Sequence, residues 1–166
     1  GVRAAAARGA TLILSGDCGI VAFDAISTAK QMGIDVIVTD HHTPGDVLPD
    51  AVAVVNPNRA DCPYENKGLC GAGVAFKVCQ ALWQKRGLDP QELWYYLDLV
   101  AIATIADLAP LNGENRVITR YGLRLLPQSR NLGVRALLGT AGLGGLTHVA
   151  AGQVSHVLAP RINAVG

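Results

Sequence analysis

Short apolar runs alternate with a helical pattern in the first third of the chain. Aliphatic and β-branched residues dominate 11–15, 34–39 and 51–55. Between the first two runs, apolar residues recur at helical spacing over 20–32, directly before Gly33. A strand, a helix and a strand of these lengths form a βαβ unit with parallel strands and a right-handed crossover. The pattern therefore predicts a parallel β-sheet with flanking helices.

The pattern after residue 68 is helical. The stretch 56–68 is polar and rich in turn-forming residues, which predicts a surface loop. Helical periodicity, punctuated by glycine and proline, then predicts four helices: 72–86, 90–107, 114–126 and 131–140. The sequence thus indicates an α/β fold, a parallel sheet with flanking helices followed by a mainly helical segment. We place a first domain at 1–110 and its helical continuation, with a basic face, at 111–166.

The composition fits a folded domain rather than a disordered or membrane-spanning chain. Of 166 residues, half are apolar and 16% are charged, and no apolar run is long enough to cross a bilayer. No signal-peptide pattern is present. The 4 cysteines include no CxxC pair, so we expect reduced thiols rather than a structural zinc site. We therefore predict a cytoplasmic protein with no membrane contact.

The net charge of +1 hides an asymmetry along the chain. Residues 1–114 contain 8 basic and all 13 acidic residues, a net charge of −5. Residues 115–166 contain 6 arginines and no acidic residue, a net charge of +6. The acidic part suits cations and the basic part suits phosphates.

Asp40-His41-His42 is the first group of candidate catalytic residues. These adjacent polar residues follow an apolar strand, and in open parallel sheets ligands bind beyond the carboxyl ends of the strands. An imidazole beside carboxylates suits a divalent transition metal such as Mn²⁺. A polar turn leading into Pro44 and Gly45 is the simpler interpretation of the same residues.

Two further carboxylates are candidate metal ligands. Asp17 follows the first strand, where small neighbours leave room for a cation; a helix N-cap is its alternative role. Asp107 is the single ionisable residue in the apolar run 99–111, and a buried lone carboxylate is costly unless it is paired or metal-bound. The alternative for Asp107 is a helix-end carboxylate that is hydrogen-bonded to the loop before Pro110.

Phosphate contacts are expected in the second half of the chain. Arg116, Arg120 and Arg124 recur every four residues, so on a helix they form one basic ridge that can follow a phosphate backbone. Arg161 and Asn163 offer a guanidinium group and an amide to a phosphate. A solvated helix face and an ordinary polar turn are the respective alternatives.

Gly71-Ala72-Gly73 opens one of the predicted helices. Glycines at a helix N-terminus let backbone N–H groups approach an anion. No Gly-Lys-Ser/Thr sequence follows, so this is not a P-loop. We interpret these glycines as sites of close helix packing.

An ordered set of motifs resembles the DHH phosphoesterase superfamily and, within it, the RecJ-type exonucleases. The signature is 39–42 (TDHH), followed by Pro44 and 48–51 (LPDA). Further segments match in the family's order and at compatible spacing: 15–20 (SGDCGI), 55–58 (VNPN), 71–77 (GAGVAFK), 105–111 (IADLAPL) and 160–164 (PRINA). Asp-His-His alone is modestly specific, whereas the ordered set spans nearly the whole chain and is highly specific.

The resemblance implies a metal-dependent 5′→3′ exonuclease that hydrolyses single-stranded DNA to 5′-mononucleotides in repair and recombination. It implies two ions, Mn²⁺ or Mg²⁺, with Asp17, His41 and Asp107 as ligands that also serve catalysis. Asp40 is expected to support these ligands from behind. His42 is expected to be a catalytic residue that faces the substrate.

The resemblance also implies the partners of the intact protein. Single-stranded DNA is the expected substrate, and Arg161 and Asn163 are expected to line the cleft that holds it. The arginine ridge is expected to contact its phosphates. A repair helicase or a single-strand-binding protein is the expected protein partner.

Two departures from the family pattern predict a fragment. Family members carry an earlier Asp-x-Asp motif and a later second domain with glycine-rich phosphate-binding features, and neither occurs in these residues. We therefore expect this chain to be inactive or nearly so by itself. Two alternatives stay open: a DHH-type phosphodiesterase acting on oligoribonucleotides or cyclic dinucleotides, and a non-catalytic DHH-like nucleic-acid-binding module.

Overall fold

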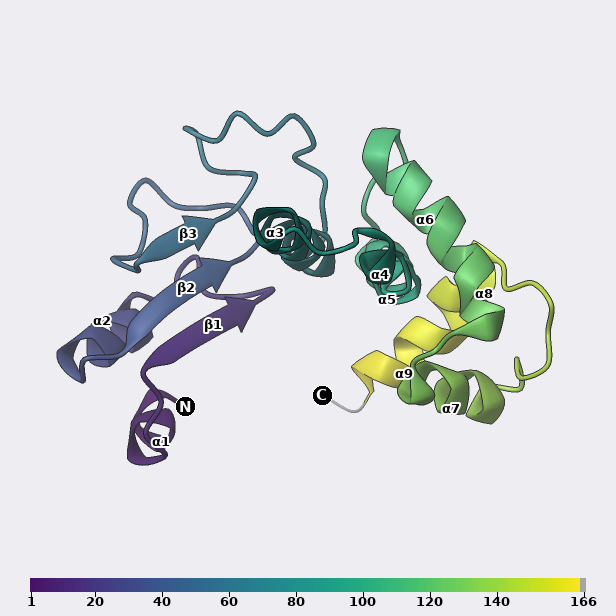
Figure 1. Cartoon of the computed structure of the whole chain (residues 1–166), viewed down its shortest axis with the longest axis horizontal. Coiled ribbons are helices and arrows are strands. Elements are labelled where there is room, and N and C mark those ends of the chain that lie inside the picture. Colours follow the sequence, from purple (N-terminus) through teal and green to yellow (C-terminus); the bar gives the residue numbers. More distant parts are fainter. Residues whose placement is uncertain (165–166) are drawn as a thin grey trace. The chain divides into compact units, whose positions relative to one another are not determined.

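The chain packs into two units, 1–75 and 76–166, which divide within a helix (Figure 1). The structure is a computed structural model and describes residues 1–164. Every strand of this part of the chain lies in the first unit. No helix among these residues has both the length and the hydrophobicity that crossing a bilayer requires. The domain bounds predicted from the sequence, 1–110 and 111–166, differ from the bounds of these two packing units and stay predictions.

A three-stranded parallel sheet forms the centre of the first unit. β1 (Leu12–Gly16), β2 (Asp35–Thr39) and β3 (Ala53–Val55) lie in that order across the sheet. The register aligns Gly16 at the end of β1 with Thr39 at the end of β2. The predicted α/β class and its parallel sheet are confirmed. Because parallel strands end at the same edge, the residues after β1 and β2 come close together.

One face of the sheet is covered by α2 (Phe23–Gln31). This helix buries Ile26 and Ala29 against β2, whose β-branched residues pack well on a pleated surface. α1 (Val2–Ala7) lies at the edge of the same hydrophobic cluster. Its alanine-rich sequence lacks the large apolar residues that reveal a helical period, so the pattern does not predict it.

Helices build the second unit, and most of them match the predicted ranges. α3 (Gly71–Arg86) runs from the first unit into the second. The next helices are, in chain order, α4 (Gln91–Trp94), α5 (Leu97–Ala106), α6 (Gly113–Leu125), the 3-10 turn η1 (Leu126–Gln128) and α7 (Leu132–Thr140). The single helix predicted over 90–107 is wrong. A turn at 95–96 separates α4 from α5, and the buried Asp98 lies in the first turn of α5, where an acidic side chain is favourable.

Three short helical segments end the described chain, where the pattern predicts none. They are α8 (Ala151–Gln153), the π-helix η2 (Val154–Leu158) and α9 (Ala159–Asn163). Val154 and Leu158 are completely buried in the main hydrophobic cluster of this unit. Segments this short are not stable as isolated helices, so tertiary burial must stabilise them. The polar turn considered for Arg161 and Asn163 is wrong, because both residues lie on α9.

α5 and α6 approach each other closely at Gly122. A Cβ built on Gly122 would lie 2.1 Å from the carbonyl oxygen of Leu97 and 2.4 Å from the Cβ of Ala101. Gly122 and Ala101 are both buried. Small side chains therefore set the distance between these two helices.

We expect Gly122→Ala to destabilise the protein. The added methyl group has no space, and overpacking of this kind costs about 1–3 kcal/mol of unfolding free energy. Gly139→Ala in α7 is the matched control, because a Cβ there meets nothing within 4 Å and alanine favours helix. Urea unfolding followed by circular dichroism measures both variants. Equal stability of the two would contradict the close approach.

Candidate functional site

Asp17 occupies the turn that leaves β1. Its φ is 63°, in the left-handed region that Gly, Asn and Asp adopt most readily. Its N–H donates to the carbonyl of Thr39 at 3.0 Å. The turn continues through Gly19 at φ 117°, where a Cβ would lie 2.9 Å from Oγ of Ser15. The N-cap of α2 is Ala22, so the capping role considered for Asp17 is wrong, and its side chain is 61% exposed.

Asp40, at the carboxyl end of β2, is 1% exposed and densely hydrogen-bonded. Its Oδ2 accepts the N–H of Ile20 at 2.9 Å, and its Oδ1 accepts the N–H groups of His41 and His42 at 2.8 and 3.2 Å. Burial alone would raise the pKa of Asp40. Hydrogen bonds from Ile20, His42 and His41 outweigh burial and hold that pKa below its ordinary value of 3.8. Asp40 is therefore an anion that organises the surrounding backbone.

The contact with Asp40 also fixes the orientation of His42. Nδ1 of His42 lies 2.7 Å from Oδ1 of Asp40. An ionised carboxylate only accepts hydrogen bonds, so Nδ1 carries the proton and Nε2 is the lone-pair atom of the neutral ring. The ring centroids of His41 and His42 are 4.5 Å apart. Carboxylate–histidine pairs of this kind orient imidazoles that bind metals.

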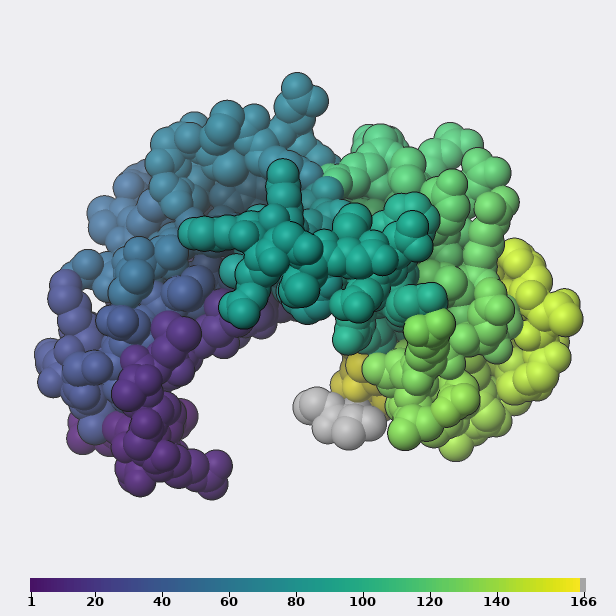
Figure 2. Space-filling model, in the orientation of Figure 1, coloured from purple at the N-terminus to yellow at the C-terminus, as the bar shows by residue number. Residues whose placement is uncertain are grey.

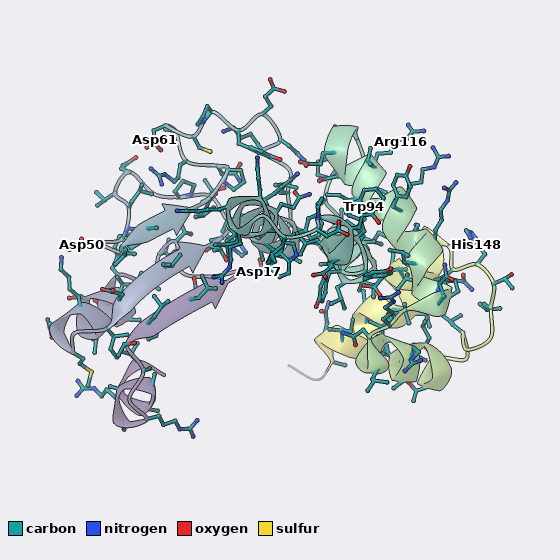
Figure 3. All side chains as sticks on the ribbon, in the orientation of Figure 1. Asp17, Asp50, Asp61, Trp94, Arg116 and His148 are labelled. Carbon is teal, nitrogen blue, oxygen red and sulfur yellow. The ribbon has the colours of Figure 1, made fainter. Side chains whose placement is uncertain are left out.

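Asp17, His41 and His42 meet at the carboxyl edge of the sheet. Nε2 of His41 lies 3.0 Å from Oδ1 of Asp17, and the three residues each offer a ligand atom within 4.8 Å of the others. Figure 3 shows Asp17 at the tip of β1. Two atoms in adjacent octahedral positions, each about 2.1 Å from an ion, would lie about 3 Å apart. The Asp17–His41 pair has this spacing, and its oxygen and nitrogen donors suit Mn²⁺.

Two asparagines hold the backbone behind this cluster, a role that sequence analysis did not identify. Nδ2 of the buried Asn56 donates to the carbonyl of His42 at 2.8 Å, and its Oδ1 accepts the N–H of Asn58 at 2.8 Å. Nδ2 of Asn58 donates to the carbonyl of His41 at 2.5 Å. The segment after β3 thus fixes the turn after β2. The only indication of this role in the sequence was the position of the two asparagines directly after a predicted strand.

The first residue of α3 lies directly against Asp17. A Cβ built on Gly71 would lie 2.0 Å from Oδ1 and 2.5 Å from Cβ of Asp17. A Cβ on Gly73 would lie 3.1 Å from Cδ2 of Leu69. Both glycines therefore allow close approach, but the neighbours are Asp17 and Leu69 rather than another helix, and at Gly71 the neighbour is the candidate ligand itself.

The prediction that Asp107 is buried is wrong. Asp107 is exposed at the C-cap of α5, where the chain leaves the apolar core. The next residue, Leu108, is also exposed and has a φ of 53°. Asp107 belongs to the second unit, whereas the Asp17–His41–His42 group lies in the first. Its role as a metal ligand stays a prediction.

The buried carboxylate of α5 is instead Asp98, which sequence analysis did not single out. Asp98 is 1% exposed, accepts the N–H of Leu99 at 2.7 Å and accepts a hydrogen bond from Oγ of Ser129. Ser129 Oγ in turn accepts the N–H of Asn131 at 3.1 Å. Asp98 thereby ties the start of α5 to the loop before α7. The sequence offers no reason to single out Asp98, because the helix predicted over 90–107 places this residue in the middle of a helix. In the structure it lies in the first turn of α5.

Arg116, Arg120 and Arg124 lie on the exposed face of α6, as their spacing predicts. Figure 3 shows Arg116 extending away from this helix. Ile118 faces the core from the opposite side. Cζ of Arg124 lies 5.8 Å from the ring centroid of the exposed Tyr121, so an aromatic ring accompanies the ridge. Phosphate binding by the ridge stays a prediction.

Arg161 and Asn163 are both exposed on α9. Nη1 of Arg161 donates to the carbonyl of Val157 at 2.7 Å, which anchors the guanidinium group at one nitrogen. A guanidinium group has five N–H donors, so this bond leaves capacity for a ligand. Their expected contact with nucleic acid stays a prediction.

The chain therefore contains an α/β domain with a parallel sheet. At the carboxyl edge of that sheet, Asp17, His41 and His42 form a cluster of the residue types that bind metal ions. The chain belongs to the DHH family, because the N-terminal domain of that family matches residues 3–104. The resemblance noted from the Asp-His-His motif is thereby confirmed.

The curated relatives include single-stranded-DNA-specific exonucleases called RecJ. The chain is 47% identical over 159 residues to RecJ of Bacillus subtilis, an alignment that covers 96% of this chain and 19% of the relative. It is 41% identical over 175 residues to RecJ of Escherichia coli, which covers 99% of this chain and 30% of the relative. The chain thus spans less than a third of the length of these relatives.

Solved structures of RecJ proteins share the fold. RecJ from Thermus thermophilus in complex with Mn²⁺ matches with a TM-score of 0.85 and 40% identity, over 99% of this chain and 24% of that chain. An exonuclease RecJ bound to manganese matches with a TM-score of 0.82 and 39% identity, over 97% of this chain and 40% of that chain. The narrower resemblance to RecJ-type exonucleases is therefore also confirmed.

We expect Gly71→Ala to separate Asp17 from His41. The new methyl group would overlap the carboxylate and Cβ of Asp17, so the turn that carries Asp17 must shift away from Nε2 of His41. Gly45→Ala is the matched control in the same unit, because a Cβ there meets nothing within 4 Å. NMR signals of the His41 ring should shift in Gly71→Ala and stay in place in Gly45→Ala. An unchanged His41 signal in both variants would contradict the steric argument.

Proposed function

We propose that the protein is a metal-dependent exonuclease that degrades single-stranded DNA in the 5′→3′ direction to 5′-mononucleotides, in repair and recombination. The observation that carries the proposal is the Asp17–His41–His42 group at the carboxyl edge of the sheet. The similarity to RecJ exonucleases along more than nine-tenths of the chain supports it. The similar solved structures are complexes with Mn²⁺ or Mg²⁺, which supports the same two metals here.

Asp17 and His41 are the proposed metal ligands, through Oδ1 and Nε2, and Asp107 is a further proposed ligand. Bound Mn²⁺ or Mg²⁺ would supply Lewis-acid chemistry that offsets negative charge on the reacting phosphodiester. Asp40 is too buried to touch an ion. Its part is to hold the backbone at His41 and the ring of His42 in orientation.

His42 is the proposed substrate-facing residue. Its side chain is largely exposed, and its Nδ1 is held by Asp40, so Nε2 is the proposed acting atom. The neutral ring accepts a hydrogen bond at Nε2, and the protonated ring donates one to a phosphate oxygen or delivers a proton to the leaving 3′ oxygen.

The proposed nucleic-acid contacts are the guanidinium groups of Arg116, Arg120 and Arg124, together with Arg161 and Asn163. Exposed arginines bind phosphates bidentately and without regard to base sequence. A repair helicase or a single-strand-binding protein is the proposed partner of the intact enzyme.

The chain by itself is proposed to be inactive or nearly so. It spans 19% and 30% of two full-length relatives. The group at the sheet edge offers three donor residues, so water would have to complete most of the octahedral shells of two ions. Metal binding by this chain should accordingly be weak but measurable.

Titration with Mn²⁺ tests the ligands without an activity assay. We expect Asp17→Asn and His41→Ala to weaken Mn²⁺ binding by about tenfold or more, because each removes one donor atom. Asp46→Asn, an exposed carboxylate in the same unit, is the matched control. The electron paramagnetic resonance signal of free Mn²⁺ measures the affinity. Equal affinity of all variants and the parent chain would overturn a metal centre at this edge.

Asp107→Asn belongs in the same titration. Weakened binding would support Asp107 as a ligand. Affinity equal to that of Asp46→Asn would remove Asp107 from the ligand set while leaving Asp17 and His41 in place.

A chimera tests the exonuclease function. When these residues replace the matching segment of Escherichia coli RecJ, we expect Mn²⁺-dependent release of 5′-mononucleotides from the 5′ end of long single-stranded DNA. Asp17→Asn in the chimera should lower that rate by about 100-fold or more, whereas Asp46→Asn should not. Chromatography of the products and thermal unfolding of each chimera are the measurements. A folded chimera that cleaves only dinucleotides, or nothing, would contradict the proposal.

A further inference from the structure

Exposed aromatic side chains gather where α4 meets α5, in the second unit. Tyr95 and Tyr96 are 42% and 54% exposed, and Trp94 beside them is also exposed. Figure 2 shows the teal stretch that includes α4 on the near surface, and Figure 3 labels Trp94 there. Clustered exposed aromatic side chains mark interaction sites, so this surface is a candidate for ligand binding.

A cleft of about 470 Å³ opens beside these rings. We call it the α4–α7 cleft, because its lining runs from α4 to the residues before α7: Glu92, Tyr95, Tyr96, Asp98, Leu99, Arg130 and Asn131. Its volume lies within the roughly 300–1,000 Å³ that is typical of small-molecule sites.

Arg130 is stacked on Tyr95 at the wall of this cleft. Cζ of Arg130 lies 3.4 Å from the centroid of the Tyr95 ring, which is van der Waals contact with the ring face. Arg130 forms no ion pair with any residue among 1–164. The stack orients the guanidinium group and leaves its edge N–H donors for an anion.

The wall is rigid because Asp98 anchors it. The buried Asp98 bonds Ser129, and Ser129 bonds the N–H of Asn131. Oδ1 of Asn131 also accepts the N–H of Val134 at 3.1 Å, as the N-cap of α7. Arg130 lies between these two fixed residues, so the cleft is preorganised for a ligand.

The groups in the cleft fit the chemistry of a nucleobase. A base has flat faces that stack on tyrosine rings or arginine planes, and an edge that presents both donors and acceptors. Glu92 offers acceptor oxygens, and Asn131 offers an amide whose Nδ2 has no partner among the described residues. An apolar peptide would leave these polar groups unmatched.

We propose that the α4–α7 cleft binds a nucleobase of single-stranded nucleic acid, with the base against Tyr95 and Tyr96 and its phosphate on Arg130. The cation of the lining is Arg130, and the Asp98 carboxylate beside it is already engaged by the N–H of Leu99 and by Oγ of Ser129. A base within a duplex keeps its faces stacked, so the cleft selects single strands. The proposal uses none of the metal-site residues and stands independently of the exonuclease function.

Oligonucleotide binding in EDTA tests the cleft. We measure fluorescence anisotropy of the chain with a labelled oligothymidine and with an abasic strand of the same length. Tyr95→Leu and Tyr96→Leu should each weaken oligothymidine binding by about tenfold and leave binding of the abasic strand unchanged. Phe23→Leu, an exposed aromatic residue on α2 in the first unit, is the matched control and should change neither.

The arginine ridge gives the contrasting result. Replacing Arg116, Arg120 and Arg124 by Gln should weaken both strands alike, because phosphate contacts do not depend on bases, and should lower the salt dependence by about 2 in log–log slope. The cleft proposal is overturned if Tyr95→Leu behaves like Phe23→Leu, or if it weakens both strands equally. It is also overturned if sedimentation shows that the tyrosine substitutions abolish self-association of the chain instead of DNA binding. Loss of Mn²⁺ binding with base-dependent affinity retained would remove only the proposed metal centre.

Discussion

The hydrogen bonds that the buried carboxylate of Asp40 accepts hold the candidate metal centre together. A carboxylate at 1% exposure stays ionised only when hydrogen bonds replace its lost hydration. Asp40 accepts four such bonds, from the backbone of Ile20, His41 and His42 and from the His42 ring. The bond to Ile20 draws the loop after β1 against the end of β2. Asp17, in that loop, is thereby placed within reach of His41.

Other residues refine this arrangement by steric and backbone constraints. Three features restrict the conformations of the cluster. They are the left-handed turn at Asp17, the missing side chain at Gly71, and the hydrogen bonds from the amides of Asn56 and Asn58. The amides hold two carbonyl groups, whereas Gly71 sets the space that the Asp17 carboxylate can occupy. A metal site with ligands held this way loses little entropy when an ion binds.

The second unit uses a buried carboxylate for a different purpose. Asp98 joins the first turn of α5 to the loop at Ser129 and gives Arg130 and Asn131 a fixed position. The two buried aspartates therefore support surfaces of opposite chemistry. Asp40 supports an acidic and imidazole-rich site that suits cations, and Asp98 supports a cationic and aromatic wall that suits single-stranded nucleic acid.

Local sequence patterns are enough to predict the parallel sheet, the main helices and the approach of Asp17 to His41 and His42. These features follow from hydrophobic periodicity and from the rule that parallel strands end at one edge. The exposure of Asp107 and the burial of Asp98 depend on packing between distant segments, because an apolar run does not reveal where a helix leaves the core. The same holds for the short helices of 151–163, whose stability comes from burying Val154 and Leu158 rather than from helix propensity.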